Sequence, residues 1–382
     1  MALTLANMTV GMADKVAAQI IDIFVRESEI LELLPFDNAV SPSGGSTLVY
    51  GYVQEKVPST AAFRAIGSEY TPNEATLRNL SVALKIFGGS FEIDRVLRSI
   101  EAQYENMNHQ IQSKIKAAVS LFHDTMINGD TATNPLEFDG LDKMLVGTET
   151  EYNTGSYIDL STSANLKTNA GEFYEALLKL INETNAQALM VNETMKTKIQ
   201  SVARELGYKT ESEQAFGRVV TTIGEGRVRL IDLKNKYTVS GDTVTKTPII
   251  GTHTRRVGSD TEYVLTSDTK FQAGKDYYTK STSEGVTTYT KATVTVGDNV
   301  TPDTYYEYVN VEVSGLTDIF AVKFDVYDGF TGVTVTGNDV ITQFIPDFTA
   351  PGAVKRGEIE MVAAVALKNS NNAGVLRNIK IA

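Results

Sequence analysis

The stretch "STLVYGYVQEKV", Ser46 to Val57, alternates apolar and polar residues as a β-strand does. A second alternating stretch, "LRNLSVALKIFG", runs from Leu77 to Gly88, and its apolar face consists of Leu80, Val82, Leu84 and Ile86. The loop between them, "PSTAAFRAIGSEYTPNEAT", is too long and too polar to form a core. The sequence therefore predicts a β-hairpin. Because an isolated two-stranded hairpin is only marginally stable in water, it needs another surface to pack on.

The longest periodic segment of the chain follows, after a Gly88–Gly89 pair that predicts a bend or a bulge. In "DRVLRSIEAQYENMNHQIQSKIKAAVSLFHDTMING" an apolar residue recurs at every third or fourth position. This spacing predicts a helix with one buried stripe: Leu97, Ile100, Tyr104, Met107, Ile111, Ile115, Ala118, Phe122 and Met126. Asn128 and Gly129 provide the stop signal. About 33 helical residues span about 50 Å, far more than the roughly three turns of an average helix.

The segments on either side have shorter patterns. Residues 1–42 form an arm, in which "MADKVAAQIIDIFVRESEILELL" has helical spacing and ends at Leu34–Pro35. From Ala170 helices and strands alternate: helix "AGEFYEALLKLINE", strand "AQALMVN", helix "ETMKTKIQSVARELG" and strand "GRVRLIDL". The strands "DIFAVKFD" and "GVTVTG" resume this α/β part, and two extended runs around "NSNNAG" predict a C-terminal hairpin.

The composition changes near Tyr237, where threonine, tyrosine, valine and glycine become frequent and the helical period disappears. "YVLTSDTKFQAGKDYYTK" and "ATVTVGDNVTPDTYYEYV" look like two copies of one pattern, with Gly274 and Pro302 at equivalent turn positions. We therefore predict a small β-rich module inserted at 252–312, since surface loops tolerate long insertions. Its tyrosines either pack against one another or bind carbohydrate through their ring faces, and packing is the commoner role.

The overall composition narrows the class of protein. With 382 residues, 42% of them hydrophobic, the chain is long enough for two or three domains with a sizeable core. A net charge of −12 disfavours a dedicated nucleic-acid-binding protein, although not a shell that surrounds nucleic acid. The absence of cysteine excludes disulfides and thiolate chemistry. No apolar run approaches the roughly 18 residues of a membrane span, and no secretory signal is evident.

The sequence contains no recognisable catalytic constellation. His109 and His123 would lie about 21 Å apart along one helix, too far for one metal ion, and His253 has no partner in the sequence. "GEGRVR", Gly224 to Arg229, lacks the last glycine of a dinucleotide-binding fingerprint and precedes a strand instead of a helix. We predict no catalytic, cofactor-binding or metal-ligating residue, no cofactor and no enzymatic activity.

What the chain does contain is a set of extended elements without an internal place for their apolar faces: the arm, the long-looped hairpin and the long helix. Many identical subunits, each lending an arm and a hairpin to its neighbours, would cover these faces and satisfy the strand edges. The pattern therefore indicates burial against other copies of the same chain.

The order of these elements resembles that of the major capsid proteins of tailed bacteriophages, the Hong Kong 97-type fold. The matching stretches are Ser43–Asp94 for the extended loop, Asp94–Asn128 for the spine helix, Ala170–Leu233 and Asp318–Pro346 for the axial domain, and "FIPDFTAPGAVKRGEIEMVAAVALKNSNNAGVLRNIKIA" for the closing segment. The resemblance implies an α+β fold with seven parts: an N-terminal arm (1–42), an extended loop hairpin (43–93), a peripheral domain with the spine helix (94–145), the first part of an axial domain (146–251), an inserted all-β module (252–312), the second part of the axial domain (313–345) and a C-terminal return to the peripheral domain (346–382).

The resemblance also implies a function. We expect a major capsid protein that self-assembles, as hexamers and pentamers, into the icosahedral head shell around double-stranded DNA. It would reside in the virion and be assembled in the host bacterial cytoplasm. The expected partners are other copies of the chain, portal and head-completion proteins, and packaged DNA held non-specifically, with no membrane. Because Met1 leads almost directly into the arm, we expect a separate scaffolding protein and not a cleaved extension.

In such a shell the hairpin would lean on the adjacent subunit. Its apolar contact residues would be Phe63, Ile66 and Tyr70, and its exposed, salt-sensitive ion pairs would involve Arg64, Glu69 and Glu74. Two other functions fit parts of the pattern. An encapsulin-like nanocompartment shell has the same fold and encloses enzymes, whereas a bacterial surface or adhesive protein would explain the threonine- and tyrosine-rich module but requires a secretion signal.

Overall fold

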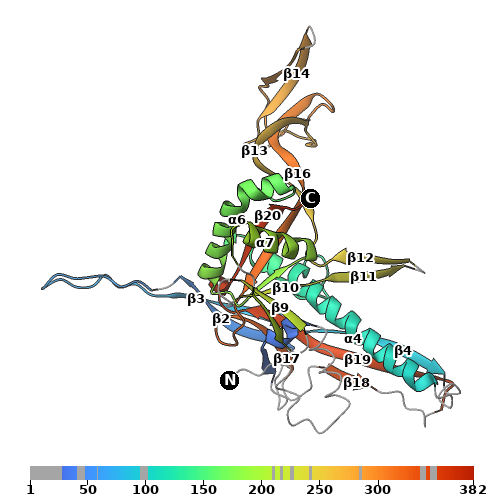
Figure 1. Ribbon diagram of the computed structural model, residues 1–382. Coiled ribbons are helices and arrows are strands. Elements are labelled where there is room, and N and C mark those ends of the chain that lie inside the picture. The colour runs from blue at the N-terminus through green and yellow to red at the C-terminus, as the bar shows by residue number, and fades with distance from the viewer. Residues whose placement is uncertain are drawn as a thin grey trace. The chain divides into compact units, whose positions relative to one another are not determined.

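The computed structural model (Figure 1) describes residues 28–40, 48–57, 59–94, 102–208, 211–215, 218–223, 228–240, 243–283, 286–335, 341–344 and 351–382. The chain divides into two compact units. Unit 1 comprises Met1–Tyr152, Ala170–Gly251 and Asp318–Leu376, and unit 2 comprises Asn153–Asn169, Thr252–Thr317 and Arg377–Ala382. The predicted arm helix before Ser28 and the predicted long helix between 95 and 101 lie outside the described residues.

Unit 1 contains a five-stranded sheet built from both ends of the chain. Its longest strand, β19 (Val354–Leu367), pairs antiparallel with β17 (Phe330–Val335), β18 (Ile341–Phe344) and β4 (Lys85–Asp94). β1 (Phe36–Val40) runs parallel to β17. Residues more than 200 positions apart in the sequence therefore form one sheet, and its stability depends on long-range pairing.

Gly88 and Gly89 lie inside β4, opposite Glu360 and Ile359, and the ladder continues through them without a register shift. The predicted bend or bulge at this pair is therefore wrong. A Cβ atom on Gly88 would lie 1.9 Å from the Ile359 carbonyl oxygen, and one on Gly89 would lie 2.9 Å from Cδ of Lys114. The two glycines instead allow the neighbouring strand and the long helix to approach β4 closely.

The predicted long helix is present as α4 (Ala102–Asn128), whose 27 residues span about 40 Å. Where its side chains are described, the predicted stripe is confirmed, because Ile111 is partly buried and Ile115, Ala118, Phe122 and Met126 are buried. The helix ends where the sequence predicts. The Gly129 N–H donates to the Thr125 carbonyl at 2.9 Å, and a Cβ atom on Gly129 would lie 2.2 Å from the Phe138 carbonyl oxygen.

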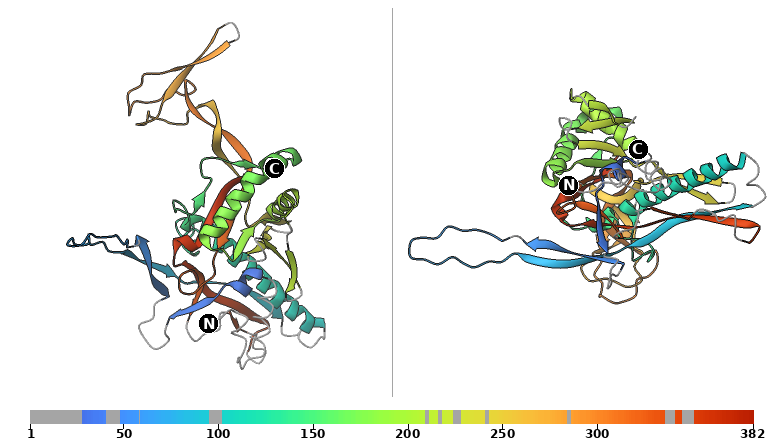
Figure 2. Two further views of the ribbon diagram at one scale, coloured as in Figure 1. Left: turned by 60° about the vertical axis from the view of Figure 1, so that its left-hand side comes forward. Right: turned by 90° about the horizontal axis from the view of Figure 1, so that it is seen from below.

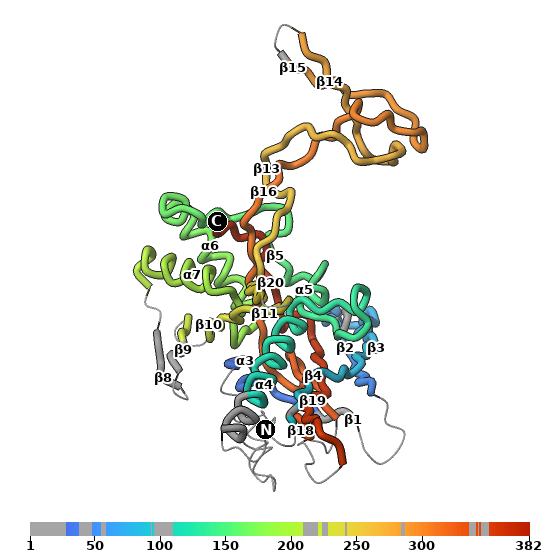
Figure 3. The backbone as a smooth tube through the Cα atoms, turned by 90° about the vertical axis from the view of Figure 1, so that its right-hand side faces the viewer, coloured from blue at the N-terminus to red at the C-terminus, as the bar shows by residue number. Residues whose placement is uncertain are grey.

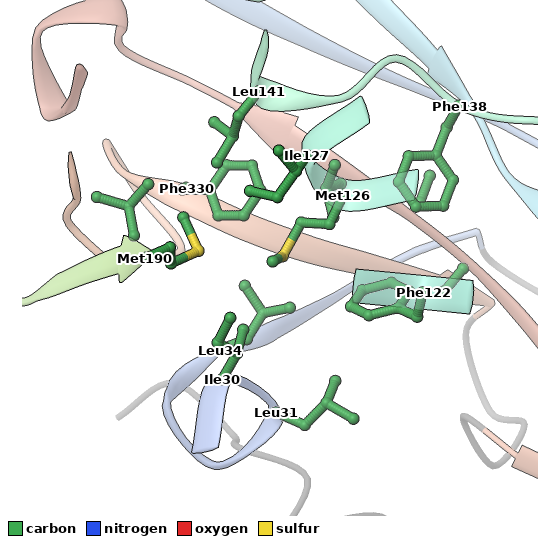
Figure 4. Close-up of a cluster of buried hydrophobic side chains, with 14 of the residues drawn as sticks. Ile30, Leu31, Leu34, Phe122, Met126, Ile127, Phe138, Leu141, Met190 and Phe330 are labelled. Atoms are coloured by element: carbon green, nitrogen blue, oxygen red, sulfur yellow. The ribbon is translucent and has the colours of Figure 1, made fainter. Parts of the chain in front are cut away.

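One hydrophobic cluster joins α4 and the five-stranded sheet to the short helix α3 (Glu29–Leu33), as Figure 4 shows. α3 ends before Leu34–Pro35, as predicted. Its N-cap is Ser28, whose hydroxyl oxygen accepts the Leu31 N–H at 3.1 Å. The same oxygen lies 2.6 Å from Nε2 of His123, a buried residue of α4, so a polar contact ties the arm to the long helix inside this core.

The α/β part predicted for the middle of the chain is also present in unit 1. The fully buried β7 (Ala188–Val191) runs parallel to β10 (Val228–Asp232), and β9 (Arg218–Ile223) and β8 (Glu211–Ala215) extend the sheet antiparallel. α6 (Ser163–Thr184) precedes β7. It starts before the predicted first residue, Ala170, and its residues before Ala170 belong to unit 2. α7 (Glu193–Glu205) follows β7, and its N-cap Asn192 accepts the Met195 N–H at 2.8 Å.

Two strand pairings differ from the sequence expectation. The stretch "GVTVTG" lies in β17 and does not continue the α/β sheet, because it pairs with β1 and β19. The two C-terminal strands do not form a hairpin, because β20 (Ala373–Lys380) pairs with β16 (Tyr305–Val322), β5 (Glu151–Tyr152) and β6 (Ile158–Asp159). A 3-10 turn at Ser370–Asn372 directs the chain from one sheet to the other.

Unit 2 consists mainly of strands. β13 (His253–Leu265) runs beside β16, which also pairs with β14 (Tyr277–Ser283), and β15 (Val286–Lys291) pairs with β14 (Figure 3). The two sequence copies are neighbours in this sheet, since Tyr278 lies opposite Tyr306. Gly274 has a left-handed φ of 81°, as a turn residue can.

The tyrosines of unit 2 contact one another. The rings of Tyr263 and Tyr289 stack with their centroids 4.0 Å apart, and Tyr278, Tyr306 and Tyr308 pack around them. A separate small core contains Phe271, Tyr277 and Val300. Of the two roles that the sequence left open for the tyrosines, these contacts favour packing.

Candidate assembly interface

The predicted hairpin is present in unit 1. β2 (Val49–Val57) and β3 (Thr76–Ala83) pair antiparallel, and within the described ranges they form a sheet of two strands only. The ribbon leaves the five-stranded sheet at its base (Figure 2). The predicted second strand, Leu77–Gly88, is divided at the buried Leu84, where the chain leaves β3 and enters β4. The same alternating stretch therefore supplies both the hairpin and one strand of the main sheet.

Polar contacts hold the base of the hairpin to the main sheet. The Tyr50 hydroxyl donates to Oδ2 of Asp37 at 2.8 Å, and Nζ of Lys368 lies 3.2 Å from the same oxygen and 5.2 Å from the centre of the Tyr50 ring. Gln54 Nε2 donates to the Leu367 carbonyl at 3.4 Å. Burial, together with the hydrogen bond to Asp37, raises the pKa of the Tyr50 hydroxyl, so this group remains a donor at neutral pH.

The loop at the far end of the hairpin, 59–75, is exposed at every position. Contacts within the loop give it a defined form. Asn73 accepts the Thr60 N–H at 2.9 Å and donates to the Thr60 hydroxyl at 2.7 Å, and the Arg64 guanidinium lies 5.4 Å from the centre of the Tyr70 ring. Hydrogen bonds between Thr60 and Asn73 therefore join the two sides of the loop, and no residue of the loop is buried against the rest of the subunit.

All six residues that the sequence nominates for inter-subunit contact lie on this loop, and all are exposed: Phe63, Arg64, Ile66, Glu69, Tyr70 and Glu74. The side chains of Phe63 and Ile66 are 107% and 106% exposed, so they contact essentially nothing in their own chain. In the described part of the chain only Arg64 and Tyr70 are brought together, and no ion pair involves Arg64, Glu69 or Glu74. Their role in assembly remains a prediction.

A second exposed hairpin was not anticipated from the sequence. β11 (Asn235–Ser240) and β12 (Thr243–Pro248) pair antiparallel, and β12 is exposed along its whole length. Near its base, Nζ of Lys236 lies 2.9 Å from Oδ2 of Asp124 on α4. The alternation on both sides of "SGDT" is the signal that predicts such a hairpin.

An apolar pocket also escaped the sequence analysis. It has a volume of about 360 Å³ and lies between β4, the C-terminal half of α4 and the loop 129–140. Phe87, Phe122 and Phe138 form an aromatic row along it, with ring centroids 5.8 and 5.9 Å apart. Its lining also includes three exposed apolar residues: Ile86 (62%), Leu121 (44%) and Leu136 (81%). The available signal was Leu136, an apolar residue in a polar loop.

Ionic contacts fix the loop that carries Leu136. Nζ of Lys143 lies 2.5 Å from Oδ1 of Asp130 and 2.8 Å from Oδ1 of Asp139. The hydrogen bond from Lys143 is the main reason that the pKa of Asp130 is lowered to about 2. Lys85 Nζ donates to the Pro135 carbonyl at 2.6 Å, which ties the loop to β4. The wall of the pocket is thus formed by a braced loop.

Candidate metal ligands do not cluster among the described residues. These residues contain no group of three or more acidic or histidine side chains that could hold a metal ion. His123 is buried against Ser28, and His253 lies in unit 2, 3.3 Å from Oδ1 of Asn378. No helix within the described ranges is long and apolar enough to span a membrane.

Comparison with known proteins identifies the fold. No family model and no curated protein matches the sequence. Among solved structures, the SrpI encapsulin of Synechococcus elongatus PCC 7942 is similar with a TM-score of 0.50 at 11% identity, over 100% of this chain and 97% of that chain. The capsid of a native GTA particle matches with a TM-score of 0.47 at 10% identity, over 97% and 92% of the two chains. The procapsid of satellite phage P4 matches with a TM-score of 0.43 at 11% identity, over 99% and 96%.

The likeness to the SrpI encapsulin, at a TM-score of 0.50, and the element order place the chain in one structural class. It has an α+β fold of the Hong Kong 97 type, the phage major capsid fold that encapsulins also have. The sequence-based expectation of this fold is confirmed. Sequence identities of about 10% show a shared fold and not a shared function. Evidence for the function therefore has to come from the hairpin and the residues around it.

Proposed function

We propose that this protein is a structural subunit of a closed protein shell and assembles with copies of itself. The observation that carries the proposal is the hairpin tip, where Phe63 and Ile66 are fully exposed on a ribbon whose base is fixed to the main sheet. Exposed apolar side chains on a projecting element mark an interaction site. A second copy of the same chain supplies such a site at every position of a symmetric assembly.

In its more specific form, the proposal is that the chain is the major capsid protein of a tailed bacteriophage. Hexamers and pentamers would form an icosahedral head around double-stranded DNA, with a separate scaffolding protein and portal and head-completion proteins as partners. The net charge of −12 supports this function, because an acidic subunit limits tight binding of the phosphate groups of packaged DNA. The site of action would be the virion, after assembly in the bacterial cytoplasm.

A nanocompartment shell is the second candidate. The similarity to the SrpI encapsulin, at a TM-score of 0.50 over nearly the full length of both chains, favours it. The two functions share the subunit contacts and differ in what the shell encloses. In both, the protein has a structural role and not an enzymatic one.

Electron microscopy of the expressed protein tests the shared part of the proposal. We expect closed shells, or rings of copies, from the full chain. A variant in which 59–75 is replaced by a short glycine–serine turn should remain folded and monomeric, because no residue of this loop is buried in its own subunit. A full chain that stays monomeric at high concentration would contradict the proposal, as would normal shells from the loop-deleted variant.

The enclosed material distinguishes the two candidates. Shells purified after co-expression with the genes that neighbour this one are expected to contain nuclease-protected DNA when they are phage heads. A defined protein cargo and no protected DNA would instead assign the chain to a nanocompartment.

A further inference from the structure

We propose that the apolar pocket lined by Ile86, Leu121 and Leu136 is the receptor for Phe63 and Ile66 at the hairpin tip of a second copy of this chain. The inference rests on the proposed function and adds to it the identity of the receiving surface. The hairpin tip and the pocket do not contact each other within one subunit. The inference is that the tip of each subunit contacts the pocket of the next one, and that this contact repeats from subunit to subunit.

The two surfaces are complementary in chemistry. Phe63 and Ile66 are the most exposed large apolar residues of the described chain, and they stand within three positions of each other in the loop. The pocket offers an aromatic row and a volume of about 360 Å³, enough to take one aromatic and one branched side chain together. Leu136, 81% exposed, would be covered by the same contact.

The charges around the two surfaces are complementary as well. One cation and one anion line the pocket, Lys85 and Glu137, and Glu137 also accepts from Nδ2 of Asn134 at 2.8 Å. The tip carries Arg64 and Glu69 on either side of Ile66, and no ion pair occupies either charge in the described part of the chain. Each rim charge therefore has an opposite charge available on an incoming tip, which fixes orientation more than it adds affinity.

The geometry of the chain prevents a tip from filling its own pocket. The pocket begins at Lys85, directly after β3 and Leu84, so it lies at the base of the same hairpin. The eight residues of β3 alone span about 26 Å in extended form, and the tip lies beyond the far end of that strand. The two strands stay paired along their length, with one irregularity between Glu55 and Val57, and the base is fixed by the contact of Tyr50 with Asp37.

A tip on one subunit and a receptor at the base of the next form a head-to-tail contact. Contacts of this kind generate rings when the rotation between subunits closes. The pocket therefore accounts for how one hairpin per subunit can build a hexamer or a pentamer without a second type of contact.

Paired cysteines test this contact directly, because the natural chain has no cysteine. We would prepare the full-length double variant Phe63→Cys/Leu136→Cys, let it assemble, oxidise it mildly and separate it on a denaturing gel without reductant. The expected result is a ladder of covalent oligomers larger than dimers, which disappears with reductant. Each single variant should give dimers at most. The matched control Phe63→Cys/Val296→Cys, whose second site is 60% exposed but lies in unit 2, should give no ladder.

The outcomes separate this inference from the proposed function. Shells without a ladder would overturn the pocket as receptor and leave the shell function standing. A ladder from rings that never close into shells would support the pocket and count against the shell. A disulfide within the monomer would overturn the inference, and neither shells nor a ladder would overturn both proposals.

A second variant gives an independent measurement. Leu136→Asp places a charge on an exposed position, so the subunit should keep its thermal unfolding temperature while its association constant falls about tenfold or more. Val296→Asp is the matched control and should assemble like the natural chain. Unchanged assembly of Leu136→Asp would contradict the assignment.

Discussion

Acidification should loosen the contact between the arm and the long helix through one residue, His123. This side chain is buried on α4, and Nε2 lies 2.6 Å from the hydroxyl oxygen of Ser28, the N-cap of α3. Burial, and then the positive charge of Lys234, lower the pKa of His123 from 6.5 to about 4. The neutral ring is therefore the form that the folded subunit holds at neutral pH.

The size of the effect follows from that pKa difference. In the unfolded chain the imidazole takes up its proton near pH 6.5, whereas in the folded subunit it does so near pH 4, so the unfolded state binds more protons between these values. His123 therefore contributes its full stability above pH 6.5 and loses it as the pH falls toward 4. At roughly 1.4 kcal/mol per pKa unit, the loss amounts to about 3 kcal/mol.

Urea unfolding of the unassembled subunit between pH 7 and pH 4 measures this loss. Circular dichroism is a suitable probe, because the chain has no tryptophan. The comparison is with His123→Gln, which keeps a polar side chain and removes the titration. Glu29, Lys116 and Asp232 line a hollow together with His123, and these charged residues are common to both proteins. We expect the natural subunit to lose about 3 kcal/mol more than the variant over this range.

A control variant separates titration from the loss of the contact. Ser28→Ala removes the cap of α3 and should cost about 1 kcal/mol at every pH, without changing the slope. Parallel pH profiles for the natural subunit and His123→Gln between pH 6.5 and pH 4.5 would refute the reasoning.

Three further predictions concern the tip, a glycine and unit 2. The double variant Phe63→Ser/Ile66→Ser should leave the unfolding temperature of the isolated subunit unchanged and weaken each inter-subunit contact by about 4 kcal/mol, roughly a thousandfold. Light scattering against subunit concentration measures this, and assembly at the natural threshold would contradict it. Gly129→Ala should destabilise unit 1 by about 2–4 kcal/mol in thermal unfolding, because its Cβ would meet the Phe138 carbonyl at 2.2 Å. Gly171→Ala, on α6 with nothing within 4 Å of its Cβ, should instead stabilise by about 0.5–1 kcal/mol, and equal effects of the two changes would refute the explanation. Tyr277→Phe removes hydrogen bonds to Oδ2 of Asp268 at 2.7 Å and from the Gln272 N–H at 3.0 Å, so unit 2 should lose about 1–2 kcal/mol. Limited proteolysis should then cut within 252–317 faster than in the natural chain, and an unchanged cleavage rate would count against this role.

The sequence by itself determined the elements whose signal is local. The apolar repeat of α4, its stop at Gly129 and the alternation of β2 and β3 depend on residues a few positions apart, so they can be read without knowing what packs against them. The exposure of the hairpin tip follows from the same local pattern. Six polar and apolar tip residues could therefore be nominated for contact before the fold was known.

The tertiary structure decided which strands pair. An alternating stretch fits the edge of any sheet, so nothing within "GVTVTG" distinguishes β1 and β19 from the strands of the α/β part as its neighbours. For the same reason the two C-terminal runs look like a hairpin and belong to two different sheets. The prediction of a bend or bulge at Gly88 was wrong for a related reason. Position 88 requires glycine because a Cβ atom there would collide with the Ile359 carbonyl oxygen, which belongs to a residue far away in the sequence.

The position of the receptor pocket could not be predicted from the sequence and is set by the tertiary structure alone. Its lining comes from β4, α4 and the loop around Leu136, three segments that become neighbours only when the core closes. Leu136, an apolar residue in a polar loop, is a signal in the sequence, but it does not reveal which residues surround it. Local sequence patterns thus determined the exposed hairpin tip of this subunit. Only long-range packing decided where the pocket for a neighbour's tip lies, because the walls of a pocket come from segments that are far apart in the sequence.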